Sequence, residues 1–74
     1  MKDPEYIKFD DIKCNMDTAK AILVDIDGEP IWFPKSCIHE DSEVYKKGTE
    51  GNLIVTRSIA EDKDVEEQGE EYEE

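Results

Sequence analysis

The chain has 74 residues, of which 21 are acidic and 9 are basic, so its formal net charge is −12 at pH 7. A chain of this length forms at most one domain, and it has little room for a deep catalytic cleft. Nucleic-acid binding relies on lysine and arginine to neutralise phosphates, so the charge argues against direct nucleic-acid binding. No apolar run approaches the roughly 20 residues that cross a membrane, so we expect no membrane partner.

The acidic residues are concentrated at one end of the sequence. Residues 61–74 hold nine acids and one base, whereas residues 1–60 hold twelve acids and eight bases. We therefore expect a small β domain, residues 1–60, followed by an acidic helix or tail, residues 61–74. Two cysteines are too few for a disulfide framework and the N-terminus has no signal-peptide pattern, so we expect a reduced protein in the cytoplasm of a host cell.

The first third of the chain is predicted to form a bent strand followed by a central strand. Residues 5–9 alternate apolar with polar side chains, and the alternation changes phase at Asp10-Asp11, which predicts a bulge or bend there. Residues 15–17 are a candidate turn. Residues 18–27 carry apolar side chains on both faces, and their β-branched content favours a central strand over a helix.

A hairpin is predicted next. Asp27-Gly28 is a preferred pair for a two-residue turn with positive φ, and residues 30–33 form the following strand. Pro34 ends this strand, because proline has no N–H to donate to a sheet. Residues 35–38 are predicted to form a single turn of 3₁₀ type, and residues 39–42 a polar loop.

The remaining strands complete the predicted fold. Residues 44–46 form a weak strand, and residues 52–57 form a stronger one. Five short strands joined by tight turns predict a mainly β protein, either a small antiparallel β-barrel or a curled sheet of SH3 or OB size.

The acidic end is predicted to begin with a short helix. Ser58 and Glu61 match the capping-box pattern, with Ser58 as the N-cap of a helix over residues 59–68. Gly69 ends this helix, and residues 70–74 should be disordered when free.

The residues that could carry chemistry are few. Cys14, Cys37 and His39 form the one set that resembles a metal site, but zinc needs three or four ligands and Cys-x-His is tighter than the usual spacings. We therefore expect no metal and no cofactor, with the cysteines acting as small buried hydrophobic residues. A Cys–His nucleophile pair would lack an oxyanion hole and a substrate cleft, so we do not expect an enzyme.

Aromatic side chains offer another kind of site. Trp32, Tyr6, Tyr45 and Tyr72 are candidates for stacking on single-stranded nucleic acid, but such platforms come with a basic groove that the sequence does not indicate. We expect Trp32 to be partly buried against the barrel. Tyr72 is a candidate anchor residue if the tail docks on a partner.

One segment resembles a known family. Residues 21–38 read AILVDIDGEPIWFPKSCI, an apolar strand, a D-G-E turn, an aromatic strand and then P-K-S. This pattern resembles a family of small proteins from phages and mobile elements, whose genes lie near single-stranded-DNA-binding and recombination genes. The family also has a later apolar strand running into a short helix, which residues 53–64 fit. The resemblance implies a phage-like origin and a small β-barrel, and it supplies no catalytic residues; the acidic end departs from it.

Three functions remain open, and we favour the first. A phage-type inhibitor, similar to DNA mimics and anti-CRISPR proteins, would place carboxylates where phosphates bind on a basic, nucleic-acid-binding host protein such as a CRISPR effector. Electrostatic steering would make this association fast and sensitive to salt. The alternatives are an accessory protein of phage replication or recombination, acting by protein contacts near single-stranded DNA, and a structural domain whose acidity only aids solubility.

The candidate contact residues come from the hairpin tip, the polar loop and the tail. A hairpin holds its carboxylates at fixed spacing, whereas a flexible tail must lose entropy to bind, so we expect the hairpin to contribute more. The full set is Asp25, Asp27, Glu29, Trp32, Glu40, Asp41, Glu43, Glu66, Glu67, Glu70, Glu71 and Tyr72.

Overall fold

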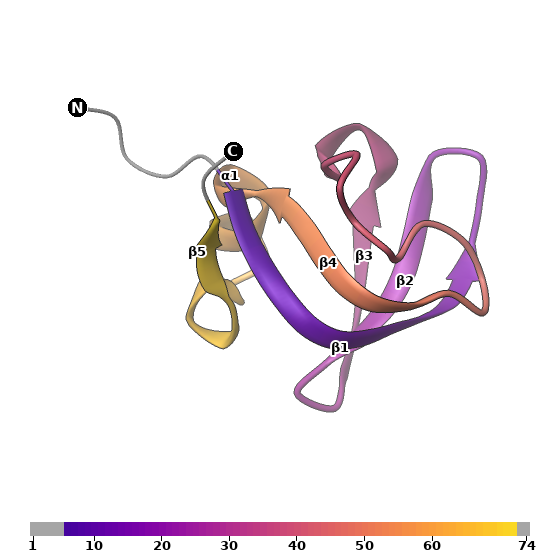
Figure 1. Ribbon diagram of the computed structural model, residues 1–74, viewed down its shortest axis with the longest axis horizontal. Helices are drawn as coiled ribbons and strands as arrows, with labels where there is room; N and C mark the ends of the chain where they lie inside the picture. The colour runs from indigo at the N-terminus through magenta and orange to yellow at the C-terminus, as the bar shows by residue number, and fades with distance from the viewer. Residues whose placement is uncertain (1–5, 73–74) are drawn as a thin grey trace.

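The computed structural model describes residues 6–72 as a mainly β protein, with five strands in an antiparallel sheet and one short α-helix near the C-terminus (Figure 1). The sheet is not closed into a barrel. In chain order the elements are β1 (Tyr6–Asp17), β2 (Ala21–Ile26), β3 (Glu29–Pro34), the 3₁₀ turn η1 (Lys35–Cys37), β4 (Glu50–Thr56), α1 (Arg57–Asp62), the 3₁₀ turn η2 (Glu66–Gln68) and β5 (Glu70–Tyr72).

The long strand β1 organises the sheet. It pairs with β4 through residues 6–13 and with β2 through residues 14–17, so that the strand order is β3-β2-β1-β4. The register with β4 shifts between Phe9 and Ile12, and Asp11 has a φ of 56°. The predicted bulge at Asp10-Asp11 is therefore confirmed, and it lets β1 curve from one end of the molecule to the other (Figure 1).

The β2–β3 hairpin forms as predicted. Asp27 and Gly28 have φ values of 53° and 83°, and Ile26 pairs with Glu29 across the turn. Since β2 lies between β1 and β3, the prediction of a central strand is also confirmed. The predicted 3₁₀ turn after Pro34 is present as η1.

Two local predictions in the first fifty residues are wrong. The turn predicted at residues 15–17 falls instead at residues 18–20, because the Thr18 hydroxyl accepts hydrogen bonds from the backbone N–H groups of Lys20 and Ala21. Residues 44–46 form no strand. The N–H groups of Tyr45 and Lys46 donate to the Thr49 hydroxyl and not to a neighbouring strand.

The predicted helix is also misplaced. Its N-cap is Thr56, whose hydroxyl oxygen accepts a hydrogen bond from the Ile59 N–H, so Ser58 lies inside the helix. α1 ends at Asp62 and does not reach Gln68, because Asp64 adopts a φ of 60° that no continuing helix allows.

The acidic tail folds back on the sheet. Tyr72, Glu71 and Glu70 of β5 pair with Tyr6, Ile7 and Lys8 of β1, where β1 extends beyond the end of β2. The prediction of disorder is wrong for Glu70–Tyr72, and its last two residues lie outside the described part of the chain. The open edge of β1 offers hydrogen-bond partners that a sequence pattern does not reveal.

Of the two predicted arrangements, a small β-barrel and a curled sheet, the closed barrel is wrong. Among the described strands, β3 pairs with β2 alone, and its other edge is free. Closure would need a strand on that edge, but Pro30 and Pro34 have no N–H to donate there. A core nevertheless forms, and its largest fully buried side chains are Phe9, Phe33, Ile22, Leu53, Val24, Val44, Val55 and Cys14.

Candidate functional site: a groove beside the free edge of β3

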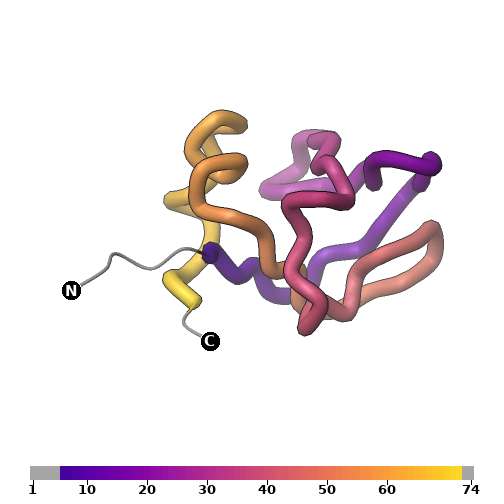
Figure 2. The backbone as a smooth tube through the Cα atoms, turned by 90° about the horizontal axis from the view of Figure 1, so that it is seen from above, coloured from indigo at the N-terminus to yellow at the C-terminus, as the bar shows by residue number. Residues whose placement is uncertain are grey.

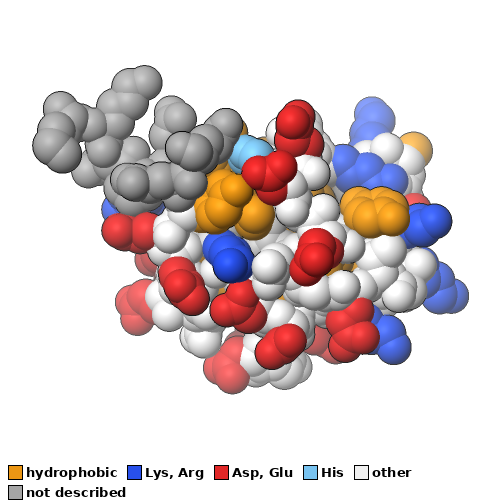
Figure 3. Space-filling model, viewed as in Figure 1, with side chains coloured by type: hydrophobic (Ala, Val, Ile, Leu, Met, Phe, Trp, Pro, Cys, Tyr) orange, Lys and Arg blue, Asp and Glu red, His pale blue; other side chains and the backbone are white. Residues whose placement is uncertain are grey.

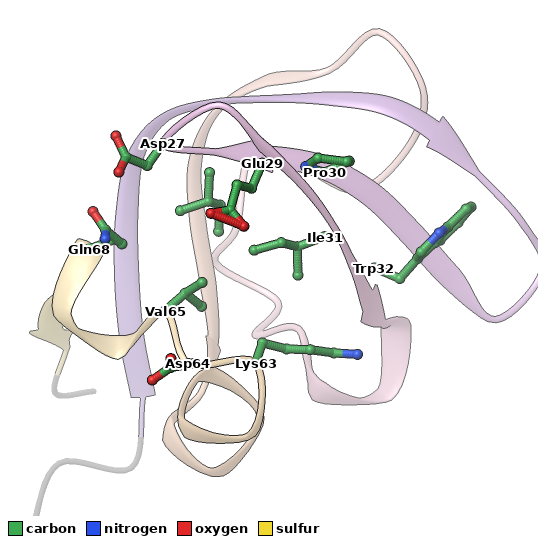
Figure 4. Close-up of a pocket in the computed structure, with 10 residues that line it drawn as sticks. Asp27, Glu29, Pro30, Ile31, Trp32, Lys63, Asp64, Val65 and Gln68 are labelled. Atoms are coloured by element: carbon green, nitrogen blue, oxygen red, sulfur yellow. The ribbon is translucent and has the colours of Figure 1, made fainter.

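A groove of about 360 Å³ lies beside the outer edge of β3, where the sheet remains open. The β2–β3 hairpin forms one wall, and residues 63–68, which follow α1, form the other (Figure 4). We name this feature the edge groove. Its walls come from segments more than thirty residues apart, so only the folded chain brings them together.

The floor of the edge groove is apolar. Ile26 and Val65 are 3% and 7% exposed, and Ile31 is half-buried between them and the solvent. The positive φ of Asp64 turns the chain inward after α1, and the Val65 N–H then donates to Ala60 O at 3.0 Å. Such a floor can cover the aliphatic part of an inserted side chain.

The rim of the edge groove is acidic. Asp27, Glu29 and Asp64 are exposed along it, and within residues 6–72 Lys63 is the one cation in its lining. Figure 4 shows the Glu29 carboxylate directed between the two walls. Asp27 and Asp64 both sit at positive-φ positions of tight turns, so their backbones are held in place. The carboxylates outnumber the lysine, and the rim therefore favours a cationic group.

Trp32 lies at one end of the edge groove (Figure 4). Partial burial was predicted for Trp32, and the side chain is 41% exposed on the edge strand β3. Trp32 pairs with Leu23 of β2, and Leu23 pairs on its other side with Met16 of β1. Met16 is 48% exposed. These three residues form an apolar row on the outer face of the sheet, and the indole can also bind a cation over its ring.

The backbone edge of β3 is poorly suited to pairing with another strand. The Lys35 N–H donates to Lys20 O at 2.7 Å, and hydrogen-bonded pairs alternate along an antiparallel ladder. Pro30, Trp32 and Pro34 therefore direct their backbone groups away from β2, and two of the three have no N–H. A partner is expected to engage the edge groove through side chains and not through a full strand ladder.

The structure brings Asp27, Glu29 and Trp32 together but separates them from Asp25. The Asp25 carboxylate accepts a hydrogen bond from Asn15 Nδ2 at 3.0 Å, and Asp25 is not among the lining residues.

Four lining residues of the second wall were not predicted, because the sequence pattern placed them inside a helix: Lys63, Asp64, Val65 and Gln68. No periodic pattern marks them; the one local hint is an aspartate that can adopt positive φ just after a short helix.

Three of the proposed contact residues hold the structure together. Asp41 Oδ2 accepts a hydrogen bond from the Tyr72 hydroxyl at 2.8 Å, and Glu43 Oε1 accepts one from the Asn52 N–H at 2.9 Å. The Tyr72 ring also lies edge-on to His39, with 5.6 Å between centroids. Tyr72 therefore anchors the tail to its own domain.

The other proposed contact residues lie outside the groove lining. Glu66 and Glu67 belong to η2, close to the groove in sequence, and Glu66 Oε2 is buried without a hydrogen-bond partner among residues 6–72. Glu40, Glu70 and Glu71 are exposed elsewhere.

The cysteines are not paired with each other. Cys14 is fully buried, and its thiol donates to Met16 O at 3.1 Å. Burial raises the pKa of the Cys14 thiol, which keeps it protonated and unreactive near neutral pH. Within residues 6–72, no group of three or more His, Cys, Asp or Glu side chains is arranged to hold a metal ion.

In the comparisons with known proteins, no family model, no curated protein and no solved structure matches this chain. Over the described residues, no helix has the length and apolar character needed to cross a membrane.

Proposed function

We propose that this protein is a non-enzymatic, phage-type inhibitor that binds a basic, nucleic-acid-binding surface of a host protein through the edge groove. One observation carries this proposal: Asp27, Glu29 and Asp64 stand on two separate turns around an apolar floor. A DNA mimic or an anti-CRISPR protein would need carboxylates at such fixed positions, because the phosphates it replaces are fixed on the nucleic acid.

The rim and the floor of the edge groove are expected to contribute differently to binding. An exposed ion pair contributes only about 0.2–1 kcal/mol to affinity, so the carboxylates mainly accelerate encounter with a basic surface. Most of the affinity must then come from buried apolar contacts with Ile31, Val65 and Trp32. A lysine or arginine of the partner suits both parts, since its stem can cover the floor while its charge reaches the rim.

A pull-down from host lysate at low and high salt would identify the partner, and surface plasmon resonance would then test the groove. The key variant combines Asp27→Asn, Glu29→Gln and Asp64→Asn; asparagine tolerates positive φ, so both turns should remain intact. The matched control combines Asp10→Asn, Asp11→Asn and Glu50→Gln, three exposed carboxylates outside the groove lining.

We expect the groove variant to reduce the association rate about tenfold or more, and the control variant to reduce it by less than about threefold. Trp32→Ala should act mainly on the dissociation rate, because it removes apolar contact and leaves the charge unchanged. Equal effects of the two triple variants would refute a groove-centred interaction, since net charge alone would then explain the binding.

A second candidate function rests on the apolar row of Met16, Leu23 and Trp32. An accessory protein of phage replication or recombination would bind another protein through such a row. This function predicts a partner that is retained at high salt and lost on Met16→Ala, whereas the inhibitor function predicts a partner that high salt releases.

A further inference from the structure

Four lysines that are scattered in the sequence gather at one end of the folded molecule. We name Lys20, Lys35, Lys46 and Lys47 the lysine end. The Lys35 N–H donates to Lys20 O at 2.7 Å. Asp17 connects Lys35 to the loop that carries Lys46 and Lys47, because its carboxylate accepts the Lys47 N–H at 2.9 Å and lies 3.7 Å from Lys35 Nζ. Figure 3 shows most of the visible basic side chains at this end, whereas most of the rest of the visible face carries acidic side chains and few basic ones.

The acidic elements α1 and β5 lie far from the lysine end, where the nearby carboxylates are those of Asp17, Glu40 and Glu50. Both views place the turn after β1 and the loop of residues 45–49 at one end of the molecule, and α1 and β5 at the other (Figures 1 and 2). The longest extent is 37 Å. Exposed charges are screened beyond about 8 Å at physiological ionic strength, so an anion at the lysine end is largely screened from the acidic end. The net charge of −12 therefore does not describe this surface.

The loop that carries Tyr45, Lys46 and Lys47 is held by hydrogen bonds to Thr49. Thr49 Oγ1 accepts the N–H groups of Tyr45 and Lys46 at 3.0 and 3.2 Å and donates to Lys46 O at 2.6 Å. Tyr45 is 55% exposed, and Lys46 Nζ lies 5.8 Å from its ring centroid. An exposed ring beside lysines on an ordered loop loses little entropy on binding.

Two hollows on this surface share Lys35. One, of about 320 Å³, lies between Lys35 and Tyr45 and includes Glu40 in its lining. The other, of about 400 Å³, lies between Lys20, Pro34 and Lys35. A phosphate close to Lys35 would therefore lie beside Lys20, and an attached base would enter the first hollow next to the Tyr45 ring.

We propose that the lysine end binds single-stranded nucleic acid, with the phosphates against the four lysines and one base stacked on Tyr45. Base stacking on an aromatic ring requires an unpaired base, which selects a single strand over a duplex. An acidic peptide would find the lysines but would have no base to place on Tyr45. This surface is separate from the edge groove, so the proposal goes beyond the inhibitor function and is independent of it.

The test is fluorescence anisotropy of the full chain with a labelled oligothymidylate of about 12 nucleotides, titrated at several salt concentrations. Four phosphate contacts predict a slope of log affinity against log salt of about −2.8, and Lys46→Gln with Lys47→Gln should make it shallower by about 1.4. The matched control, Lys8→Gln with Arg57→Gln, has the same charge change away from the lysine end and outside the edge groove, and it should leave the slope unchanged. Tyr45→Ala should weaken binding about fivefold or more with the slope preserved.

Several results would overturn the proposal. One is no binding at about 25 mM salt and about 100 μM protein, conditions that favour ionic contacts. Another is equal weakening by the control variant, which would mean that the contacts are not at the lysine end. Equal competition by polyglutamate, equal affinity for a duplex, or full binding by Tyr45→Ala would each show that the surface recognises charge alone. Circular dichroism of every variant ensures that a loss of binding is not a loss of fold.

Discussion

Replacing Gly69 with alanine should strain or release the C-terminal strand β5. Gly69 has a φ of −118° and a ψ of −171°, an extended conformation that alanine adopts freely, so the backbone itself is not the obstacle. The obstacle is space: an added Cβ would lie 2.6 Å from Ile7 Cγ2, 2.7 Å from Lys8 O and 2.9 Å from Phe9 Cε1. Ile7 and Phe9 belong to the core and Lys8 O is a backbone atom, so these neighbours cannot move aside at low cost.

The structure limits the size of the effect. Inserting a methyl group into a packed site destabilises by about 1–3 kcal/mol. The chain can avoid this strain by releasing β5, which breaks its pairing with β1 and the bond between the Tyr72 hydroxyl and Asp41. Those hydrogen bonds contribute about 0.5–1.5 kcal/mol each, and release returns about 1–2 kcal/mol of backbone entropy per residue. We therefore expect a net loss of about 1–2 kcal/mol.

Thermal melts would measure this loss, at about 4–8 °C per kcal/mol for a domain of this size. A chain ending at Gln68 sets the upper limit, because it lacks β5 altogether. Glu67→Ala is the control, an exposed substitution in the adjacent turn η2 that should change little. Hydrogen exchange at the amides of Glu70–Tyr72 would separate release of β5 from strain that leaves it in place.

Two outcomes would refute this reasoning. If Gly69→Ala melts like the wild type and the β5 amides exchange at unfolded rates in both proteins, the strand is not docked on β1. If Gly69→Ala loses much more stability than the chain ending at Gln68, release of β5 does not relieve the clash.

Three further perturbations test other parts of the fold. Gly28→Val should lower the melting temperature while Gly28→Asn preserves it, because the φ of 83° disfavours a β-branched residue and nothing lies within 4 Å of the added Cβ; equal melting would argue against the tight turn. Ser42→Ala should reduce the free energy of unfolding in urea by about 1–3 kcal/mol, since the Ser42 hydroxyl accepts the buried Ile54 N–H at 2.9 Å and donates to Ile54 O at 3.0 Å; an unchanged urea midpoint would contradict this. Because burial raises the pKa of the Cys14 thiol, the contribution of this thiol to stability is complete below the ordinary pKa of 9.0 and is lost as pH rises through the folded-state pKa. The difference in unfolding free energy between wild type and Cys14→Ala, measured in urea, should therefore shrink at alkaline pH. A constant difference would exclude this linkage.

Sequence patterns predicted correctly those features that depend on residues close together in the chain. Asp27-Gly28 specifies its turn through the backbone preferences of two residues, and the apolar side chains on both faces of β2 indicate a central strand. The bulge at Asp10-Asp11 shows in the sequence because one extra residue reverses the alternation on either side of it. Three residues of the candidate site were predictable in the same way, because they share one hairpin: Asp27, Glu29 and Trp32.

Local competition explains the sequence predictions that were wrong. Ser58 and Thr56 are both good N-caps, and only the end of β4 decides that Thr56 takes that position. Val44 is apolar and fully buried, but the N–H groups of Tyr45 and Lys46 after it donate to the Thr49 hydroxyl. Val44 is therefore buried without belonging to a strand.

The tertiary structure alone decided where the charged segments lie. β5 is short and acidic, and it becomes a strand because β1 runs past the end of β2 and leaves backbone groups there to be paired. The edge groove exists because β3 has no further neighbour, so the segment after α1 faces it across an opening. The lysine end combines residues from the turn after β1, from η1 and from the loop of residues 45–49. Each of these features depends on contacts between segments distant in the chain, and charge counts along a sequence carry no information about which segments will meet.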